Sequence, residues 1–214
     1  MSANRVPRIH VLAGVNGAGK SSIGGAAVRQ HRGVYFNPDE ASRTLMTANP
    51  TMTQAAANST AWHVGVRLLR HAIKTRLDFA FETTLGGNTI TRLLTQAASH
   101  GFEIHVWYAG LSSPELHIAR VQSRVRRGGH DIPAAQIRQR YEHSRLNLIE
   151  LLPHLATLRV YDNSAEADPD AGRIPKLTLV LQMEQGNIYH PPDLTHTPHW
   201  AKPIVAAALK ISPR

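Results

Sequence analysis

Eight residues near the start of the chain have the types and spacing of a phosphate-binding loop. The segment GVNGAGKS at 14–21 fits G-x-x-x-x-G-K-[ST] in full and lies between a predicted strand at 8–13 and a predicted helix. Glycines let the backbone approach phosphate oxygens, and free N–H groups at a helix N-terminus attract anions. Lys20 is expected to reach the terminal phosphates and Ser21 to ligate Mg²⁺. The segment therefore predicts a site for the polyphosphate tail of a nucleoside triphosphate, which we expect to be ATP. The residues assigned to this site are Gly14, Asn16, Gly17, Ala18, Gly19, Lys20, Ser21 and Ser22.

A carboxylate follows the second predicted strand. The apolar run at 34–36 ends in Asn37, Pro38 and Asp39, residue types that stop a strand through proline geometry and side-chain bonds to the backbone. Phosphoryl transfer to a hydroxyl profits from a carboxylate that accepts the proton of the acceptor. Asp39 is therefore a candidate catalytic base. The same residues equally suit an N-cap or an Asx turn at 37–40, and the residues alone leave both interpretations open.

Polar residues also follow a third predicted strand, at 77–81. Glu82, Thr83 and Thr84 stand where an ordinary P-loop NTPase carries the Asp that holds Mg²⁺, although no Asp takes that role plainly here. Glu82 is a candidate for binding acceptor hydroxyls or for supporting Mg²⁺ through water, and both threonines can donate hydrogen bonds. The alternative is a polar strand end that caps the next turn.

Arginines are dense around a double glycine in the second half of the chain. Those three or four residues apart share a helix face, and mobile arginines can close over a nucleotide and neutralise the transferring phosphoryl group. The pattern predicts a helical-hairpin lid at about 114–152, whereas a solvated charged face or a nucleic-acid contact strip are the alternatives. The residues concerned are Arg120, Arg124, Arg126, Arg127, Arg138 and Arg140, which flank GGHD at 128–131.

Length and composition limit the kinds of protein that can present these groups. The 214 residues, of which 42% are hydrophobic and 18% charged, suit one domain with a full core. The chain has no cysteine, which excludes disulfides, thiolate metal sites and a thiol nucleophile. We find no apolar segment near the length that spans a bilayer, so we expect a cytoplasmic protein without a membrane partner. A formal net charge of +9 favours anionic partners without choosing among them.

Strands and helices alternate along the chain, which predicts an α/β fold with a parallel sheet covered on both faces. In such sheets ligands bind outside the carboxyl ends of the strands, so the polar groups described above should converge on one crevice. Further strands are predicted at 102–108 and 157–161. Helices are predicted at 61–76, at 90–99, at 114–127, where the Gly128 and Gly129 pair ends the helix, and from Pro133 onward; in the first of these Trp62, Val66, Leu69 and Ile73 form one apolar stripe. Two runs, at 176–183 and around Ile188, predict a terminal hairpin within a C-terminal appendage at about 176–214.

With these residues in view, the chain resembles the zeta toxin family of P-loop kinases from about Ile9 to Ser164. The arginine-rich stretch is far more discriminating than a phosphate loop alone. The resemblance rests on VLAGVNGAGKSS, FNPDE, FETTL, RVQSRVRRGGHDIPAAQIRQRYEHS and YDNS. It implies a kinase-like three-layer sandwich with a central five-stranded parallel sheet. It also implies ATP with Mg²⁺ and transfer of phosphate to a hydroxyl.

The resemblance also assigns roles to particular residues. Lys20 and Ser21 match the phosphate and metal residues, and Asp39 matches the catalytic base, which tips the open choice at Asp39 towards catalysis. Glu82 and Thr84 match the acceptor-binding pair. We place the lid arginines at Arg120 and Arg127, with Arg124 close behind, assign His130 and Arg140 to the acceptor, and make Asn163 the candidate for contacting adenine.

The acceptor and the partners are less closely determined by the sequence. Toxic members of the family phosphorylate UDP-N-acetylglucosamine, and an anionic small-molecule acceptor of this kind is expected here without being assured. An antitoxin protein is a possible partner, although no residue points to one. Two other functions stay open: a polynucleotide 5′-hydroxyl kinase or other nucleic-acid enzyme, which the charge allows but which we favour less, and an ATP-gated interaction module without turnover.

Overall fold

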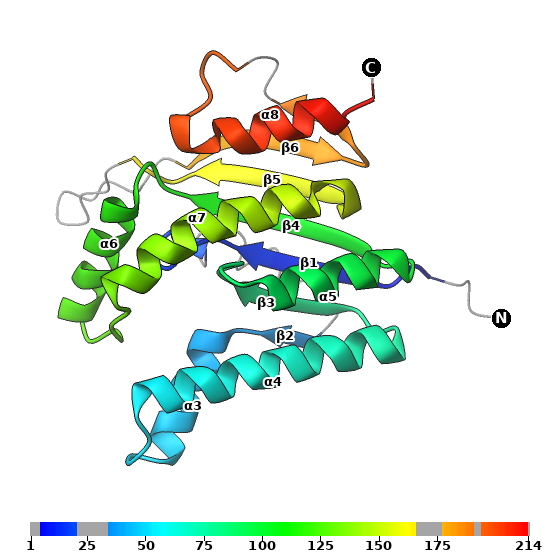
Figure 1. Cartoon of the computed structure of the whole chain (residues 1–214). Helices are drawn as coiled ribbons and strands as arrows, with labels where there is room; N and C mark the ends of the chain where they lie inside the picture. The colour runs from blue at the N-terminus through cyan, green and yellow to red at the C-terminus, as the bar shows by residue number, and fades with distance from the viewer. Residues whose placement is uncertain (1–4, 21–33, 166–176, 191–193, 214) are drawn as a thin grey trace.

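A seven-stranded sheet with β1 near its middle organises the chain (Figure 1). The computed structural model describes residues 5–20, 34–165, 177–190 and 194–213. The strand order is β2-β3-β1-β4-β5-β6-β7, in which the first five are parallel and the last two pairings are antiparallel. The strands are β1 (Arg8–Ala13), β2 (Val34–Phe36), β3 (Phe79–Thr83), β4 (Glu103–Gly110), β5 (Thr157–Asp162), β6 (Thr178–Glu184) and β7 (Asn187–His190).

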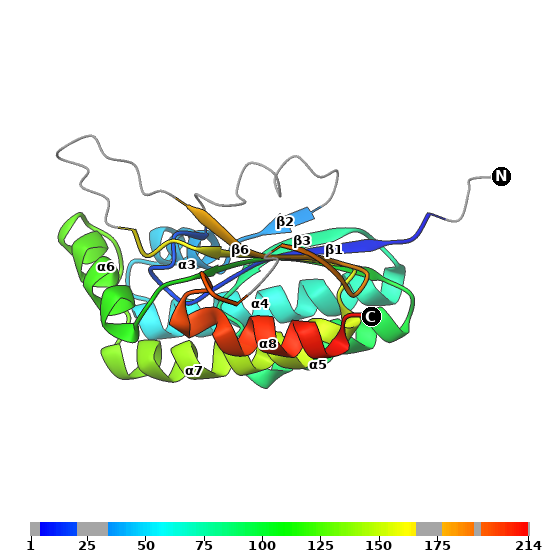
Figure 2. The same ribbon diagram turned by 90° about the horizontal axis from the view of Figure 1, so that it is seen from above.

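Helices α4, α5, α7 and α8 lie on one face of this sheet, as Figure 2 shows. The helix predicted directly after the phosphate loop falls on residues 21–33, outside the described residues. The helices are α3 (Pro38–Ala48), α4 (Gln54–Thr75), α5 (Asn88–Ser99), α6 (Pro114–Arg126), α7 (Ala134–Leu151) and α8 (Lys202–Ile211), with short 3₁₀ turns η1 (Leu152–His154) and η2 (His199–Ala201).

The predicted α/β class and its five parallel strands are confirmed, but the sheet is larger than predicted. The terminal hairpin is not a separate appendage, because β6 pairs with β5 and extends the sheet to seven strands. β3 begins two residues later than predicted and includes Glu82 and Thr83. Two helices, α3 and α8, were not predicted.

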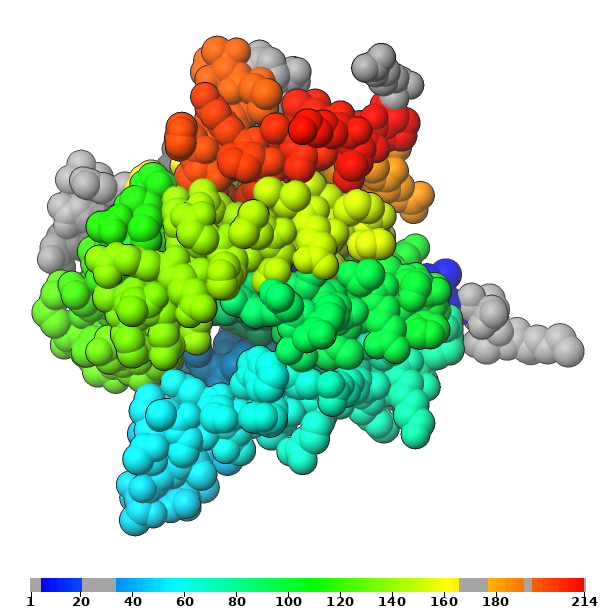
Figure 3. Space-filling view, in the orientation of Figure 1, coloured from blue at the N-terminus to red at the C-terminus, as the bar shows by residue number. Residues whose placement is uncertain are grey.

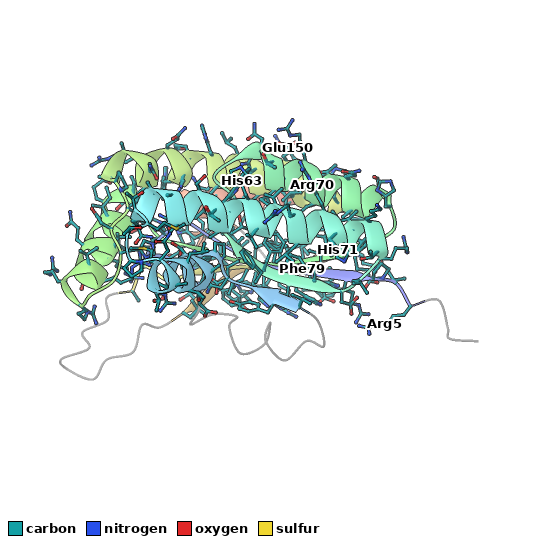
Figure 4. The ribbon with its side chains drawn as sticks, turned by 90° about the horizontal axis from the view of Figure 1, so that it is seen from below. Arg5, His63, Arg70, His71, Phe79 and Glu150 are labelled. Atoms are coloured by element: carbon teal, nitrogen blue, oxygen red, sulfur yellow. The ribbon has the colours of Figure 1, made fainter. Side chains whose placement is uncertain are left out.

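The core lies between the sheet and the helix layer. β1 is buried from Ile9 to Ala13, as expected for a strand with parallel neighbours on both sides. Figure 4 looks at the molecule from below, with α4 running along the sheet over Phe79. Arg5, which pairs with Asp78 at 2.5 Å, lies at the end of the sheet away from α6. The other end, where the parallel strands finish, is therefore the one that carries α3 and α6.

The α6–α7 hairpin is joined to the phosphate loop by a small apolar cluster of its own. Val15 of the loop packs with Val121 of α6 and with Ile132 and Ile137 at the start of α7. Leu148 and Leu151, at the other end of α7, belong to the main core. The end of α7 is therefore part of the main core, whereas α6 and the segment that leads into α7 pack against the phosphate loop. Among the described helices, none is long and apolar enough to cross a membrane.

Candidate active site

The phosphate loop has a backbone that only glycine accommodates at its first position. Gly14 has φ +138°, and a Cβ there would lie 2.3 Å from the carbonyl oxygen of Ala109 on β4. Its N–H donates to the carbonyl of Thr83 at 3.2 Å, and its own carbonyl accepts from Lys20 Nζ at 3.0 Å. The loop thus follows the end of β1 closely and brings the Lys20 ammonium to its centre. Ser21 and Ser22 lie outside the described residues.

Asn163, predicted to contact adenine, makes a contact with the phosphate loop. It follows β5, is 4% exposed, and donates from Nδ2 to the carbonyl of Ala18 at 2.9 Å. A Cβ on Gly19 would lie 2.5 Å from the same nitrogen, so the amide is packed directly under the loop. The buried Asn163 side chain therefore supports the loop on its protein-facing side.

Replacing Asn163 with alanine should therefore weaken ATP binding through its effect on the phosphate loop. The carbonyl of Ala18 loses a buried donor, which costs about 1–3 kcal/mol. We expect a lower melting temperature and an ATP dissociation constant raised about tenfold, since 1.4 kcal/mol corresponds to a factor of ten. Calorimetry with ATP measures the second effect. Exposed Asn187→Ala is the control, and unchanged affinity in Asn163→Ala would contradict this role.

His117 of α6, which the sequence analysis missed, holds the loop from the side. Its Nδ1 donates to the carbonyl of Asn16 at 2.8 Å, which fixes the neutral tautomer, and the ring is buried against Tyr141. Nε2 is buried and has no hydrogen-bond partner among the described residues. Burial, together with the nearby cations Lys20 and Arg120, lowers the pKa of His117 to about 4, against the hydrogen bond to Asn16, which raises it.

This histidine predicts loss of stability in mild acid. The pKa rises from about 4 in the folded chain to the ordinary 6.5 on unfolding, so the unfolded state binds more protons between these values. Stability is therefore present above pH 6.5 and falls as the pH drops towards 4, by ~3 kcal/mol from this group. Urea denaturation across that range measures it. His117→Gln, which can still donate to Asn16, should show a flatter profile, and equal slopes would contradict the assignment.

The end of β2 separates the two interpretations left open for Asp39. The N-cap of α3 is Asn37, whose Oδ1 accepts from the N–H groups of Asp39 and Glu40 at 2.8 and 3.3 Å. The Asp39 carboxylate does not serve as the cap. It lies 3.8 Å from Arg124 Nη1 and 3.8 Å from His130 Nε2.

Arg124 and His130 reach Asp39 because the double glycine folds the chain back. Gly128 ends α6 in a left-handed conformation, as predicted, and Gly129 donates to the carbonyl of Arg124 at 3.0 Å. Arg124 Nη2 in turn donates to the carbonyl of His130 at 3.1 Å. Burial lowers the pKa of His130, and Asp39 opposes that shift.

Glu82 is held at the end of β3 by two donors that the sequence analysis did not identify. Tyr35 Oη and Asn37 Nδ2 both donate to Glu82 Oε1, and Glu82 is 6% exposed. Burial lowers the pKa of the Lys20 ammonium, while Glu82 and Asp39, in that order, raise it. Two carboxylates and the loop lysine thus form one electrostatic group. Because α3 and β3 supply the carboxylates, the exits of two parallel strands meet at the phosphate loop.

Thr84 lies in a tight turn after β3. The turn is closed by Thr83 Oγ1 and Thr84 Oγ1, which accept from the N–H groups of Leu85 and Gly86 at 3.1 and 3.3 Å. Leu85 has φ +50°, an uncommon conformation for a branched residue, and its carbonyl accepts from Asn147 of α7 at 2.6 Å. Packing around α7 therefore fixes the turn that presents Thr84.

The arginines divide into inward and outward groups. Arg140 donates to Asn16 Oδ1 at 2.8 Å, and burial lowers its pKa. Arg120 lies beside the loop, since a Cβ added to Gly17 would be 3.5 Å from the Cβ of Arg120. The Arg120 guanidinium donates to the carbonyl of Ala165. Arg127 bonds to Ser123, one turn back on α6. The geometry thus brings Arg124 to Asp39, although the sequence analysis had ranked Arg127 ahead of it.

One cavity of about 670 Å³ collects most of these groups. Its lining includes Asn16, Lys20, Asp39, Glu82, Thr84, His130 and Arg140. It also includes residues of α4 that the sequence analysis missed or took for core, above all Trp62, which was assigned to an apolar stripe and is 44% exposed. Figure 3 shows the surface hollowed between α4 and α7. The cavity has a volume typical of small-molecule sites.

The fold and the site together define a P-loop protein of the kinase-like α/β class. A phosphate loop follows the central strand, and carboxylates from two neighbouring strand exits share a cavity with its lysine. The chain belongs to the zeta toxin family, whose sequence model, described as Zeta toxin, matches residues 1–169. An uncharacterized protein of Haemophilus influenzae is 32% identical over 131 residues, which cover 60% of this chain and 88% of that protein.

Solved structures share the fold at low sequence identity. The AvrRxo1-ORF1:-ORF2 complex matches with a TM-score of 0.68 and 13% identity, over 100% of this chain and 73% of that one. The same complex with ATP matches with a TM-score of 0.67 and 14% identity, over 97% of this chain and 65% of that one, slightly under two thirds of its length. The PezAT toxin-antitoxin system of Streptococcus pneumoniae gives 0.55 and 15% identity, over 82% and 75%.

Proposed function

We propose that the chain is an ATP-dependent phosphotransferase that moves the γ-phosphate of ATP to a hydroxyl of a small acceptor. The observation that carries this proposal is that Lys20 and Asp39 line one cavity, so a phosphate donor and a proton acceptor face the same space. A hydrolase needs only the half of the cavity that binds the phosphate donor. The other half of the cavity, with Glu82 and Thr84, provides room and hydrogen bonds for an acceptor.

The residues divide the reaction between them. Lys20 and the loop N–H groups hold the terminal phosphates, while Arg124 and Arg140 supply further positive charge. The oxygen of the acceptor hydroxyl bonds to the γ-phosphorus while Asp39 takes the hydroxyl proton. The bond between the γ-phosphorus and the β–γ bridging oxygen breaks at the same time, which releases ADP. Glu82 and Thr84 orient the acceptor. His130 lies beside Asp39 and completes the wall of the cavity.

Mg²⁺ fits this donor set. The ion prefers oxygen ligands and keeps several waters, and the Glu82 carboxylate lines the cavity beside Lys20, where it can support Mg²⁺ through water. Ser21, its predicted ligand in the loop, lies outside the described residues. When bound, Mg²⁺ supplies neutralising charge at the β- and γ-phosphates.

The related structures support the nucleotide and suggest a partner class. One AvrRxo1 complex contains ATP, and we assign ATP to this chain on that ground together with its loop. AvrRxo1-ORF1 is found with ORF2, and PezAT is a toxin-antitoxin system. A protein partner of antitoxin type is therefore proposed here too. The acceptor is open between nucleotide sugars such as UDP-N-acetylglucosamine and uncharged hydroxyl compounds.

The inward direction of Arg124 and Arg140 favours a small acceptor over a polynucleotide. Both contact groups of the site, whereas Arg126, Arg127 and Arg138 are exposed on the helices. The test is incubation with γ-labelled ATP, Mg²⁺ and a panel of nucleosides, nucleotides, nucleotide sugars and a 5′-hydroxyl oligonucleotide, followed by mass analysis. A labelled small molecule supports the proposal, whereas a labelled oligonucleotide favours the polynucleotide kinase. Label in inorganic phosphate alone would overturn both.

A further inference from the structure

The acceptor side of the cavity has a wall that carries no charge. α4 contributes Gln54, Ala55, Asn58, Trp62, Gly65 and Val66 to the lining, at spacings that place them on one helix face. Phe36 packs against this wall, since a Cβ on Gly65 would lie 2.6 Å from its ring. We name these six α4 residues the α4 wall.

The charges of the cavity lie elsewhere and are unfavourable for an anionic acceptor. Among the described lining residues the permanent cations are Lys20 and Arg140. Both are bonded to the phosphate loop, Lys20 to the Gly14 carbonyl and Arg140, from α7, to Asn16. Asp39, Glu82 and Asp131 line the cavity as well. A diphosphate seated against the α4 wall would lie near carboxylates without a cation on that wall, since Arg124 is outside the lining and faces Asp39.

The α4 wall nevertheless offers directed hydrogen bonds. Asn58 Oδ1 accepts from Ser42 Oγ at 2.8 Å and from Gln54 Nε2 at 2.8 Å, and Gln54 Nε2 also donates to Ser42 Oγ at 3.0 Å. Ser42 is buried, so this triangle fixes both amides. The Asn58 NH₂ group and the Gln54 carbonyl have no partner among the described residues. A donor and an acceptor therefore stand side by side at the cavity.

Trp62 supplies an aromatic surface on which a flat ligand can stack. Its indole is 44% exposed although it lines the cavity, and it is one helical turn from both Asn58 and Val66. Aromatic side chains stack on heterocyclic bases irrespective of base identity. A neutral wall with a donor, an acceptor and an indole is complementary to the edge and face of a heterocycle.

We propose that the acceptor is an uncharged nucleoside, its base on the α4 wall and a sugar hydroxyl directed at Asp39. This inference rests on the proposed phosphotransferase function and deepens it by naming the substrate class. It excludes nucleotide sugars as the preferred acceptor, because their diphosphate finds no cation on the α4 wall.

Equilibrium binding tests this proposal independently of turnover. Calorimetry should show that uridine or adenosine binds the ATP-free protein at least about tenfold more tightly than its own 5′-monophosphate and than UDP-N-acetylglucosamine, a margin set by one buried uncompensated charge. Tighter binding of the nucleotide sugar, or no binding of any nucleoside, would overturn the proposal. Initial rates of transfer with the same compounds should follow the same order. Nucleoside binding without any phosphorylated product would contradict the kinase function while leaving the ligand class intact.

Two variants test the contacts. Trp62→Ala should weaken nucleoside binding about 5- to 100-fold, the effect of removing one stacking partner, and leave ATP binding unchanged. Asn58→Asp keeps the bonds from Ser42 and Gln54 but removes the free donor, and it should weaken nucleoside binding about tenfold. Tyr189→Ala, at an exposed aromatic of β7 outside the cavity, is the matched control. Wild-type nucleoside affinity in both α4 variants would refute the placement of the base.

Discussion

Replacing Lys20 with alanine is expected to lower the rate of phosphoryl transfer on the order of 10³-fold, the loss seen when one group that stabilises transition-state charge is removed. The reason is position: the Lys20 ammonium lies at the centre of the loop, bonded to the Gly14 carbonyl and within the field of Glu82 and Asp39. ATP binding should weaken as well, since the lysine is expected to bind the phosphates in the ground state. Single-turnover transfer and ATP calorimetry measure the two effects separately.

The matched control for this variant is Lys74→Ala. Lys74 lies in the last turn of α4, is exposed and does not line the cavity. Lys74→Ala therefore removes the same charge at a distance from the loop. Both variants should keep the wild-type circular dichroism spectrum. Equal loss of activity in the two variants would show a general effect of net charge. Full activity in Lys20→Ala would contradict the assignment of this loop to the phosphate donor.

Replacing Asp39 with asparagine is expected to leave ATP binding within about twofold and to lower the transfer rate by about 10²- to 10⁴-fold, the range for loss of a general base. The substitution preserves shape and does not disturb the start of α3, because Asn37 caps the helix. It removes the anion that faces Arg124 and His130. The rate at saturating ATP and acceptor is the quantity to compare.

Glu40→Gln is the control for Asp39→Asn. Glu40 is the next residue of α3 and also carries a carboxylate in the first turn, but it does not line the cavity. Its variant should transfer phosphate at the wild-type rate. Unchanged transfer by Asp39→Asn would end the assignment of the base and return Asp39 to a structural role.

The phosphate loop and the strand exits could be predicted because their signals are local. Glycines at 14, 17 and 19 all have positive φ, and the strand-loop arrangement around them follows from short-range pattern. The double glycine that ends α6 is of the same kind. Parallel pairing then places Asp39 and Glu82 near the loop without any knowledge of side-chain contacts.

The contacts that the sequence analysis missed are long-range ones. Asn163 meets Ala18 across 145 residues and His117 meets Asn16 across 101, distances over which no residue pattern is informative. Trp62 fits an apolar stripe by spacing, yet it lies over the cavity rather than in the core. The α3 helix had a local signal, an Asn cap before Pro38 and two acidic residues, which the strand-stop interpretation of the same residues obscured.

The terminal hairpin was underestimated for a different reason. Its strands were recognisable, but edge pairing of β6 with β5 depends on a sheet that is assembled from distant segments. Trp200 packs against Gly110 at the end of β4, where a Cβ would lie 2.1 Å from its ring. That contact ties the region of α8 to the main core, and it requires knowledge of both partners.

The fate of the γ-phosphate in wild type and Asp39→Asn, followed in one reaction with ATP, Mg²⁺ and the acceptor panel, tests the two-substrate site most directly. The predicted result is a phosphorylated organic acceptor from the wild type, with little inorganic phosphate, and almost none from Asp39→Asn despite normal ATP binding. The contradicting result is transfer to water alone by both proteins, or equal acceptor phosphorylation by both.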